Sequence, residues 1–305
     1  MVVSTFGARM VELWVPDKNG VLGNVVLGLP SPQHYADRAN LYLGCTVGRV
    51  AGRIPQAHFA GSGLSLSLEP NEGPNQLHGG GTRSFDRVEW ELITFESDES
   101  VVAEFHYVSP AGEEEYPGEL TVVSRYELFA QGVLTSTLTA ETTSACPVNL
   151  TTHSYWNLSG KAGSTIHDHE LTADVAWHVE TGEGQLPTGE LTPTPHQLSL
   201  AAPGWDDTFI LEETVHTQTP AATLSHAGSG RTLTLYTTEP ALQIYTAGYL
   251  PEEAFDDVHV LTAFGGVCLE PQRINDNALL PQFPSIVVEP GETYTHVTTH
   301  VFSCL

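Results

Sequence analysis

The chain has 305 residues, with 37 acidic against 11 basic side chains and a formal charge of −26. This negative charge repels phosphate backbones and anionic lipids, so neither nucleic acid nor a membrane surface is expected as a partner, and a neutral or cationic small molecule is favoured. The apolar share of 40% and the charged share of 16% indicate a folded core rather than a disordered chain.

The first candidate element is a short helix at Ser31–Arg38, where Ser31 can cap the helix and Pro32 takes its first position. The dominant hydrophobic period along the rest of the chain is two, which is typical of strands with one buried face. Another helical turn is predicted at Pro251–Phe255. Strands are predicted at Val88–Phe95, Val101–Val108, Leu120–Phe129, Val133–Ala140, Thr232–Tyr236, Leu242–Thr246 and Tyr294–Phe302.

The alternation is clearest at Leu120–Phe129, where Leu120, Val122 and Tyr126 fall on one face and Thr121 on the other. Turn signals separate the strands, and neither a sequence repeat nor a linker divides the chain. We therefore predict an all-β protein with very little helix, built as one large antiparallel β-sandwich domain over residues 1–305.

Cys45, Cys146, Cys268 and Cys304 are widely separated and form no C-x-x-C pair, which argues against a structural zinc site and a disulfide scaffold. The N-terminus lacks the pattern of a secretory signal, and no stretch approaches the roughly 18 apolar residues of a membrane helix. We expect free thiols in the cytoplasm and a monomer or weak homodimer.

Two glycine-containing segments carry polar side chains that could bind a ligand. In Gly48–Ile54, the guanidinium of Arg53 offers a rigid fork of donors for vicinal hydroxyls, although a structural pair with an acid explains the segment equally well. In Asn75–Gly81, three glycines beside His78 allow a ligand to approach the backbone closely, whereas an ordinary turn histidine is the alternative.

Three further segments combine aromatic and titratable residues. Thr151–Leu158 sets His153 and Tyr155 beside other polar groups, which suits the apolar faces and hydroxyl rim of a sugar, but a core histidine is the default. Asp206 and Asp207 are flanked by aromatic residues. Glu270 ends an apolar run, where burial would raise its pKa and make it a general base; a strand-end residue facing water is the alternative.

Other chemistries have weaker support. His167-Asp168-His169 could suggest a metal ion, but no third ligand has a recognisable spacing. The chain has no G-x-S-x-G motif, which disfavours a serine hydrolase. We therefore expect neither a metal nor a cofactor.

Taken together and in chain order, the polar and aromatic segments described above resemble those of the aldose 1-epimerase (galactose mutarotase) family. The resemblance extends over nearly the whole chain and rests on Phe6–Ala8, Gly48–Ile54, Asn75–Gly80, His153–Asn157, Trp205–Phe209, Leu269–Gln272, Phe283–Ser285 and Pro290–Tyr294. The family usually has another strand before the Phe6–Ala8 segment, so the resemblance predicts a shortened edge of the first sheet.

The resemblance implies a β-supersandwich that interconverts the α and β anomers of free aldohexoses such as glucose and galactose. It implies that Glu270 takes the proton of the C1 hydroxyl and that His153 donates a proton to the ring oxygen. Arg53, His78 and Asp206 match positions that bind sugar hydroxyls, with Asp207 as the alternative to Asp206. We also expect substrate contacts from two residues of the same motifs, Asn75 and Tyr155.

Three other functions remain open at this point. A hexose-6-phosphate epimerase of the same fold would need more cations than Arg53 for a dianion. A glycosidase could use Glu270 and Asp206 as paired carboxylates. A carbohydrate-binding module without catalysis would not need both His153 and Glu270.

Overall fold

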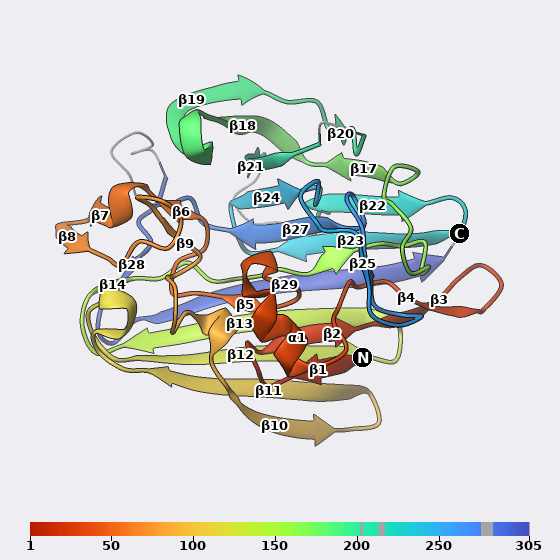
Figure 1. Cartoon of the computed structure of the whole chain (residues 1–305), viewed down its shortest axis with the longest axis horizontal. Helices are drawn as coiled ribbons and strands as arrows, with labels where there is room; N and C mark the ends of the chain where they lie inside the picture. The colour runs from red at the N-terminus through yellow and green to blue at the C-terminus, as the bar shows by residue number, and fades with distance from the viewer. Residues whose placement is uncertain (202–203, 213–216, 276–282, 305) are drawn as a thin grey trace.

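The computed structural model describes residues 1–201, 204–212, 217–275 and 283–304, and two large antiparallel sheets dominate it (Figure 1). The larger sheet has nine strands in the order β10-β11-β12-β13-β29-β23-β22-β17-β20. Its strands are β10 (Glu91–Glu96), β11 (Ser100–Ser109), β12 (Leu120–Phe129), β13 (Val133–Thr142), β29 (Thr293–Cys304), β23 (Arg231–Thr237), β22 (Ala222–His226), β17 (Glu170–Ala173) and β20 (Gln197–Leu198).

The second sheet has six strands in the order β16-β27-β24-β21-β18-β19. These strands are β16 (Tyr155–Trp156), β27 (Val267–Gln272), β24 (Ala241–Tyr245), β21 (Asp206–Leu211), β18 (Val175–Thr181) and β19 (Pro187–Pro193). The hairpin of β18 and β19 lies at the upper edge of the view in Figure 1.

Short strand pairs and one helix connect and flank the sheets. The pairs are β1 (Val2–Ser4) with β2 (Arg9–Glu12), β3 (Trp14–Pro16) with β4 (Leu22–Asn24), β5 (Thr46–Val47) with β15 (Thr151–Thr152), β6 (Arg53–Ile54) with β9 (Gln76–Leu77), β7 (His58–Gly61) with β8 (Leu64–Ser67), β14 (Cys146–Pro147) with β28 (Val287–Val288), and β25 (Glu253–Ala254) with β26 (Val260–Leu261). The helix α1 spans Pro32–Asp37. Single 3₁₀ turns occur at Ala39–Leu41, Pro55–Ala57, Phe85–Arg87, Glu113–Glu115 and Glu183–Gln185.

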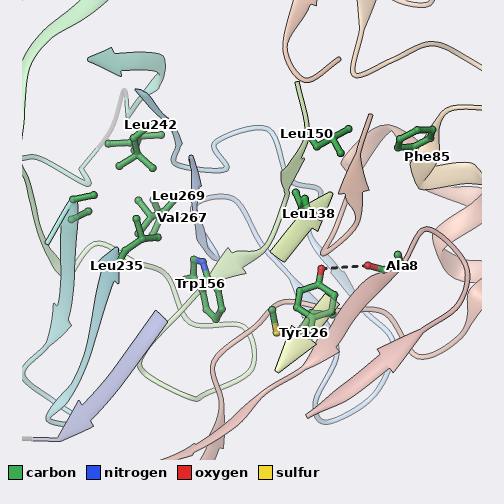
Figure 2. Packing of buried hydrophobic residues seen from close by; sticks show 14 of the residues in the cluster. Ala8, Phe85, Tyr126, Leu138, Leu150, Trp156, Leu235, Leu242, Val267 and Leu269 are labelled. Atoms are coloured by element: carbon green, nitrogen blue, oxygen red, sulfur yellow. Dashed lines mark hydrogen bonds between the residues drawn. The ribbon is translucent and has the colours of Figure 1, made fainter. Parts of the chain in front are cut away.

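The two large sheets share one hydrophobic core. In β12, Leu120, Val122 and Tyr126 are fully buried, and the Tyr126 hydroxyl donates a hydrogen bond to the Ala8 carbonyl at 3.3 Å (Figure 2). Leu235 of the nine-stranded sheet and Leu269 of the six-stranded sheet belong to the same cluster. Burying each such side chain stabilises the fold by about 1.5–3 kcal/mol. The inward-facing side chains of the predicted alternation therefore hold the two sheets together.

The predicted all-β fold is confirmed, and the strand at Leu120–Phe129 matches β12 from end to end. The helix near Ser31 is also confirmed, with Ser31 as its N-cap. The helical turn predicted at Pro251–Phe255 is wrong. Glu253–Ala254 instead forms β25, because this segment pairs with β26 and the Glu253 carboxylate binds the Arg38 guanidinium.

The described residues include no helix that is long and apolar enough to cross a membrane. All four cysteines carry free thiols, and Cys45, Cys146 and Cys268 are buried.

Candidate active site

A cavity of about 700 Å³ opens on the face of the six-stranded sheet that points away from the shared core. The strands β21, β24 and β27 form its floor, and β6, β18 and the segments around Tyr42 and His78 contribute to its walls. Its polar and aromatic lining includes Tyr42, Arg53, Glu72, His78, His153, Tyr155, Asp206, Thr208, Gln243, Tyr245 and Glu270.

The strand register arranges the floor of the cavity in two rows. In the first row, Thr208 of β21 lies opposite Gln243 of β24, which lies opposite Glu270 of β27. In the second row, Asp206, Tyr245, Cys268 and Tyr155 lie opposite one another across four strands. Because alternate residues of a strand share a face, the residues between them, such as Leu269, point into the core (Figure 2).

Glu270 is a buried carboxyl group with incomplete hydrogen bonding. Its side chain is 2% exposed, and one oxygen, Oε1, lies 3.6 Å from His153 Nε2. The other oxygen, Oε2, is buried without a hydrogen-bond partner. Burial, together with the charge of Asp206, raises the pKa of Glu270 well above its usual range. Such a group is able to take up a proton near neutral pH.

His153 lies between β15 and β16, where its backbone is fixed at both polar groups. Its N–H donates to the Cys45 carbonyl, and its own carbonyl accepts the N–H of Gly44, both at 2.9 Å. The rings of Tyr155 and Tyr42 stack on the imidazole with centroid distances of 5.0 and 5.9 Å. Burial lowers the pKa of His153 to about 4.

The Glu270 and His153 side chains form a pair of buried titratable groups whose nearest atoms lie 3.6 Å apart. Burial favours the neutral form of each group, because it raises the pKa of Glu270 and lowers that of His153. Moving a proton from a neutral Glu270 to His153 gives a carboxylate base beside an imidazolium acid without changing the net charge. The pair can therefore supply the base and the acid of one reaction.

The His78 imidazole also faces the cavity, with its ring edge-on to His153 at a centroid distance of 5.5 Å. The Gly52 N–H donates to His78 Nδ1 at 3.2 Å, so the neutral ring carries its proton on Nε2. Burial, with His153 nearby, lowers the pKa of His78 well below its usual value. His78 thus provides a fixed N–H donor.

Arg53 and Asp206 are each held by a neighbour on the cavity wall. The Arg53 guanidinium forms a bidentate pair with the Glu72 carboxylate at 2.7 and 2.9 Å. Asp206 Oδ1 accepts a hydrogen bond from Gln243 Nε2 at 2.9 Å. The positions of both side chains are therefore set before any ligand arrives.

Comparisons with known proteins agree with this geometry. Residues 1–300 match the family model described as Aldose 1-epimerase. The chain belongs to the aldose 1-epimerase family. It is similar to the galactose mutarotase of Sus scrofa, with 37% identity over 316 residues that cover 99% of this chain and 90% of that protein.

Solved structures of the aldose 1-epimerase family show the same fold. An aldose epimerase homologue from C. elegans superposes with a TM-score of 0.87 at 25% identity, covering 99% of this chain and 95% of that one. The galactose 1-epimerase from Lactobacillus acidophilus superposes with a TM-score of 0.84 at 25% identity, covering 99% and 90%. The resemblance inferred from the motifs is confirmed.

Six of the seven predicted site residues line the cavity: Arg53, His78, His153, Tyr155, Asp206 and Glu270. Asn75 lies behind the wall, where its side-chain oxygen accepts the Gln56 N–H at 3.0 Å. Tyr155 is largely committed to structure, because its hydroxyl donates to the Leu41 carbonyl at 2.7 Å. Asp207 lies opposite the core residue Ile244, so Asp206 is the aspartate that faces the cavity.

The glycines beside His78 have a different role from the predicted one. A Cβ atom on Gly79 would lie 1.9 Å from the Gly48 carbonyl oxygen, so glycine here lets the two motif segments pack backbone against backbone. Arg49 of the same segment is buried, and its guanidinium donates to the Pro117 and Gly118 carbonyls at 3.0 Å. It is a structural arginine, unlike Arg53.

Sequence reasoning missed several cavity residues. Gln243 and Tyr245 lie on one face of β24, a strand that was predicted correctly. Gln243 lies opposite Glu270 and Tyr245 lies opposite Asp206, so the alternation of residues along this strand could have indicated that both face the cavity. Tyr42 gave no such signal, because it follows a 3₁₀ turn in a left-handed conformation outside any periodic pattern.

Proposed function

We propose that this protein is a mutarotase that interconverts the α and β anomers of free aldohexoses such as glucose and galactose. The observation that carries this proposal is the buried Glu270 and His153 pair, with a carboxylate oxygen that has no partner of its own at a cavity of about 700 Å³. The activities in the names of the related proteins support it.

The reaction needs two proton transfers and no transfer of electrons. Glu270 takes the proton of the C1 hydroxyl while His153 Nε2 donates a proton to the ring oxygen, and the C1–O5 bond breaks to give the open aldehyde. Rotation about C1–C2 presents the other carbonyl face. On reclosure O5 attacks C1, His153 recovers the proton of O5, and Glu270 returns its proton to the C1 oxygen.

His78, Arg53 and Asp206 orient the sugar in this proposal. His78 offers its Nε2–H, Arg53 offers the donors that Glu72 leaves free, and Asp206 offers an acceptor. These groups fix the ring so that the C1 hydroxyl meets Glu270 and the ring oxygen meets His153. Their contribution is orientation rather than proton transfer.

A neutral sugar suits the cavity better than a sugar phosphate. On the described part of the wall the arginines are Arg53 and Arg273, and both have a carboxylate nearby. Glu72 binds Arg53 directly, and Glu239 Oε2 lies 3.7 Å from Arg273 Nε. A phosphate dianion would have to compete with both carboxylates.

Polarimetry tests the proposed reaction. Freshly dissolved α-D-glucose and α-D-galactose should reach their equilibrium rotation faster with the protein than without it, and Glu270→Gln should abolish the acceleration. No acceleration by the wild-type protein would leave a binding module as the better interpretation. Faster equilibration of the 6-phosphates than of the free sugars would instead identify the phosphate-specific enzyme, and a monosaccharide substrate separates mutarotation from glycoside hydrolysis.

We also propose that residues 1–305 act as one domain in the cytoplasm. The shared core of the two large sheets supports the first statement, and the four free thiols support the second.

A further inference from the structure

Cys268 contacts the proposed acid but takes no part in the reaction described above. Its Sγ atom lies 3.4 Å from His153 Nδ1, and both side chains are buried. Glu270, two residues further along β27, faces the other ring nitrogen, Nε2, at 3.6 Å. One strand therefore places a neighbour at each nitrogen of the imidazole.

We propose that Cys268 is a positioning residue, whose Sγ accepts a hydrogen bond from His153 Nδ1–H and thereby keeps Nε2 as the nitrogen that exchanges a proton with the substrate. This inference rests on the proposed mutarotase function. It concerns the tautomer of His153, which can be measured without any turnover.

The proposed reaction requires this tautomer. When the imidazolium donates its Nε2 proton to the ring oxygen, the neutral ring that remains carries its proton on Nδ1. The free Nε2 lone pair can then recover the proton on reclosure. A group that donated to Nδ1 would force the neutral ring to keep its proton on Nε2, and the return transfer would have no acceptor.

A thiol sulfur is a weak, neutral acceptor, and because its S–H is also a weak donor, the proposal requires the S–H to point away from Nδ1. Burial, with the nearby Glu270 carboxyl group, raises the pKa of Cys268 well above its usual value, so the sulfur is not a thiolate. An anionic partner at Nδ1 would stabilise the imidazolium and hold the proton on His153. A neutral sulfur orients the ring without opposing proton release.

The aromatic contacts fix the ring plane but not the tautomer. Tyr42 and Tyr155 stack on the imidazole, and His78 meets it edge-on. Cys268 Sγ is the side-chain partner of Nδ1 among the described residues, and the backbone of His153 itself also hydrogen-bonds the ring. Cys268 therefore adds a side-chain acceptor at Nδ1 to this backbone bond, and its removal should weaken the preference for the Nδ1–H tautomer.

Nitrogen-15 NMR of histidine-labelled protein tests the proposal, with the His153 signal assigned from a His153→Asn variant. Wild type at neutral pH should show His153 as the Nδ1–H tautomer. Cys268→Ala should shift the ring toward a mixture and lower kcat by about three- to tenfold, the effect of one ordinary hydrogen bond, with little change in KM. Cys268→Ser, which keeps an acceptor, should restore both the tautomer and most of kcat.

Cys146→Ala is the matched control, because this buried cysteine contacts Arg49 and does not line the cavity. It should leave the His153 signal and kcat unchanged. If Cys268→Ala does not fold, Cys268→Val removes the acceptor while filling the space.

The two proposals fail in different ways. A wild-type protein that accelerates mutarotation but shows the Nε2–H tautomer, or a Cys268→Ala variant with an unchanged tautomer and kcat, overturns the role of Cys268 and leaves the mutarotase function standing. A wild-type protein without mutarotase activity overturns the function, whatever the spectrum shows.

Discussion

Histidine lies beside a carboxyl group in several regions of the molecule, and two of these regions differ in whether the hydrogen bonding is complete. At the first, Glu270 faces His153 beside the cavity. At the second, near the ends of β17 and β22, Asp168 lies 3.1 Å from His169 Nδ1 and 3.1 Å from His226 Nε2. The two rings of the second cluster stack at a centroid distance of 4.6 Å.

In the second cluster, every ring nitrogen has a defined partner. His169 Nε2 accepts the Leu158 N–H at 2.9 Å, and His226 Nδ1 accepts the Ser229 N–H at 3.0 Å. The opposite nitrogen of each neutral ring therefore carries the proton and donates it to Asp168. Neither ring has a lone pair free for a metal ion at this carboxylate, so the cluster fits a structural role rather than the metal site that its residue types suggest.

At the first cluster, by contrast, Glu270 Oε2 has no partner, and the 3.6 Å between Oε1 and His153 Nε2 exceeds a good hydrogen bond. The protein leaves this bonding capacity unused at the cavity. This difference supports the proposed division, in which the first cluster is available for chemistry at the cavity and the second stabilises the fold.

The largest expected effect is on Glu270. Glu270→Gln should lower kcat by about 10³-fold, because the amide cannot accept the C1 hydroxyl proton. Polarimetry on α-D-galactose measures the loss. Full activity in this variant would show that the proton goes elsewhere.

The same variant should not be less stable at neutral pH. The pKa of Glu270 is raised on folding, so its favourable contribution is complete below the unfolded value near 4.5 and is lost as pH rises through the folded value. Glutamine has no charge to bury. Urea unfolding should therefore give Glu270→Gln a midpoint equal to or above that of wild type, with a difference that grows as pH rises.

A pair of histidine variants compares the clusters directly. His153→Asn should lower kcat by about a hundredfold, because the ring oxygen loses its proton donor. His226→Asn should leave kcat within about twofold, because it breaks bonds that are not needed for the reaction, but it should lower the unfolding midpoint. Equal loss of activity in both folded variants would contradict the division between a catalytic and a structural cluster.

How much of this division could be predicted from sequence depends on which contacts are local. The strand at Leu120–Phe129 was predicted to the residue, because its alternation of buried and exposed residues is a property of the segment itself. Glu270 and His153 were predicted from their motifs. Their distance was not, since 117 positions of chain separate residues 153 and 270, and long-range contacts such as the pairing of β16 with β27 bring the segments together.

Other features depend on partners that no local pattern reveals. The turn at Pro251–Phe255 was predicted as a helix, but its conformation follows from β26 and Arg38. Asp168 and His169 drew attention in the sequence, whereas their partner His226 lies 58 residues beyond Asp168. The two clusters differ in whether their hydrogen bonds are complete, and this difference exists only in the folded chain.

A third paired group lies at the cavity, and its two side chains bind each other while one of them keeps free donors. The Arg53 fork binds Glu72 with two hydrogen bonds and can still offer donors to a sugar. Arg53→Lys should raise KM for galactose by about tenfold with a smaller change in kcat, since a lysine cannot reproduce the fork. Steady-state rates measured against sugar concentration separate the two constants. A loss confined to kcat would place Arg53 in the chemistry instead.

The smallest expected effect is at Asp168. Asp168→Asn leaves one of the two histidine N–H groups without an acceptor, and the side chain is 69% exposed, so water can replace part of the lost bonding. We expect a loss of about 1 kcal/mol in the free energy of unfolding and a kcat within about twofold of wild type. Urea unfolding and polarimetry on the same preparation measure both.

The pH dependence gives this last prediction a second test. Burial lowers the pKa of His169 to about 4, so the stability that its neutral form contributes is complete above the unfolded value near 6.5 and is lost as pH falls through about 4. His153 has a lowered pKa of about 4 for the same reason and contributes in the same direction. The contribution of these histidines should therefore fall between pH 6.5 and 4. Asp168→Asn should show the same fall from a lower stability at neutral pH, without a change in kcat at neutral pH. A large fall in kcat at neutral pH in a fully folded Asp168→Asn protein would show that the completed cluster is coupled to the reaction, and that complete hydrogen bonding does not by itself mark a structural site.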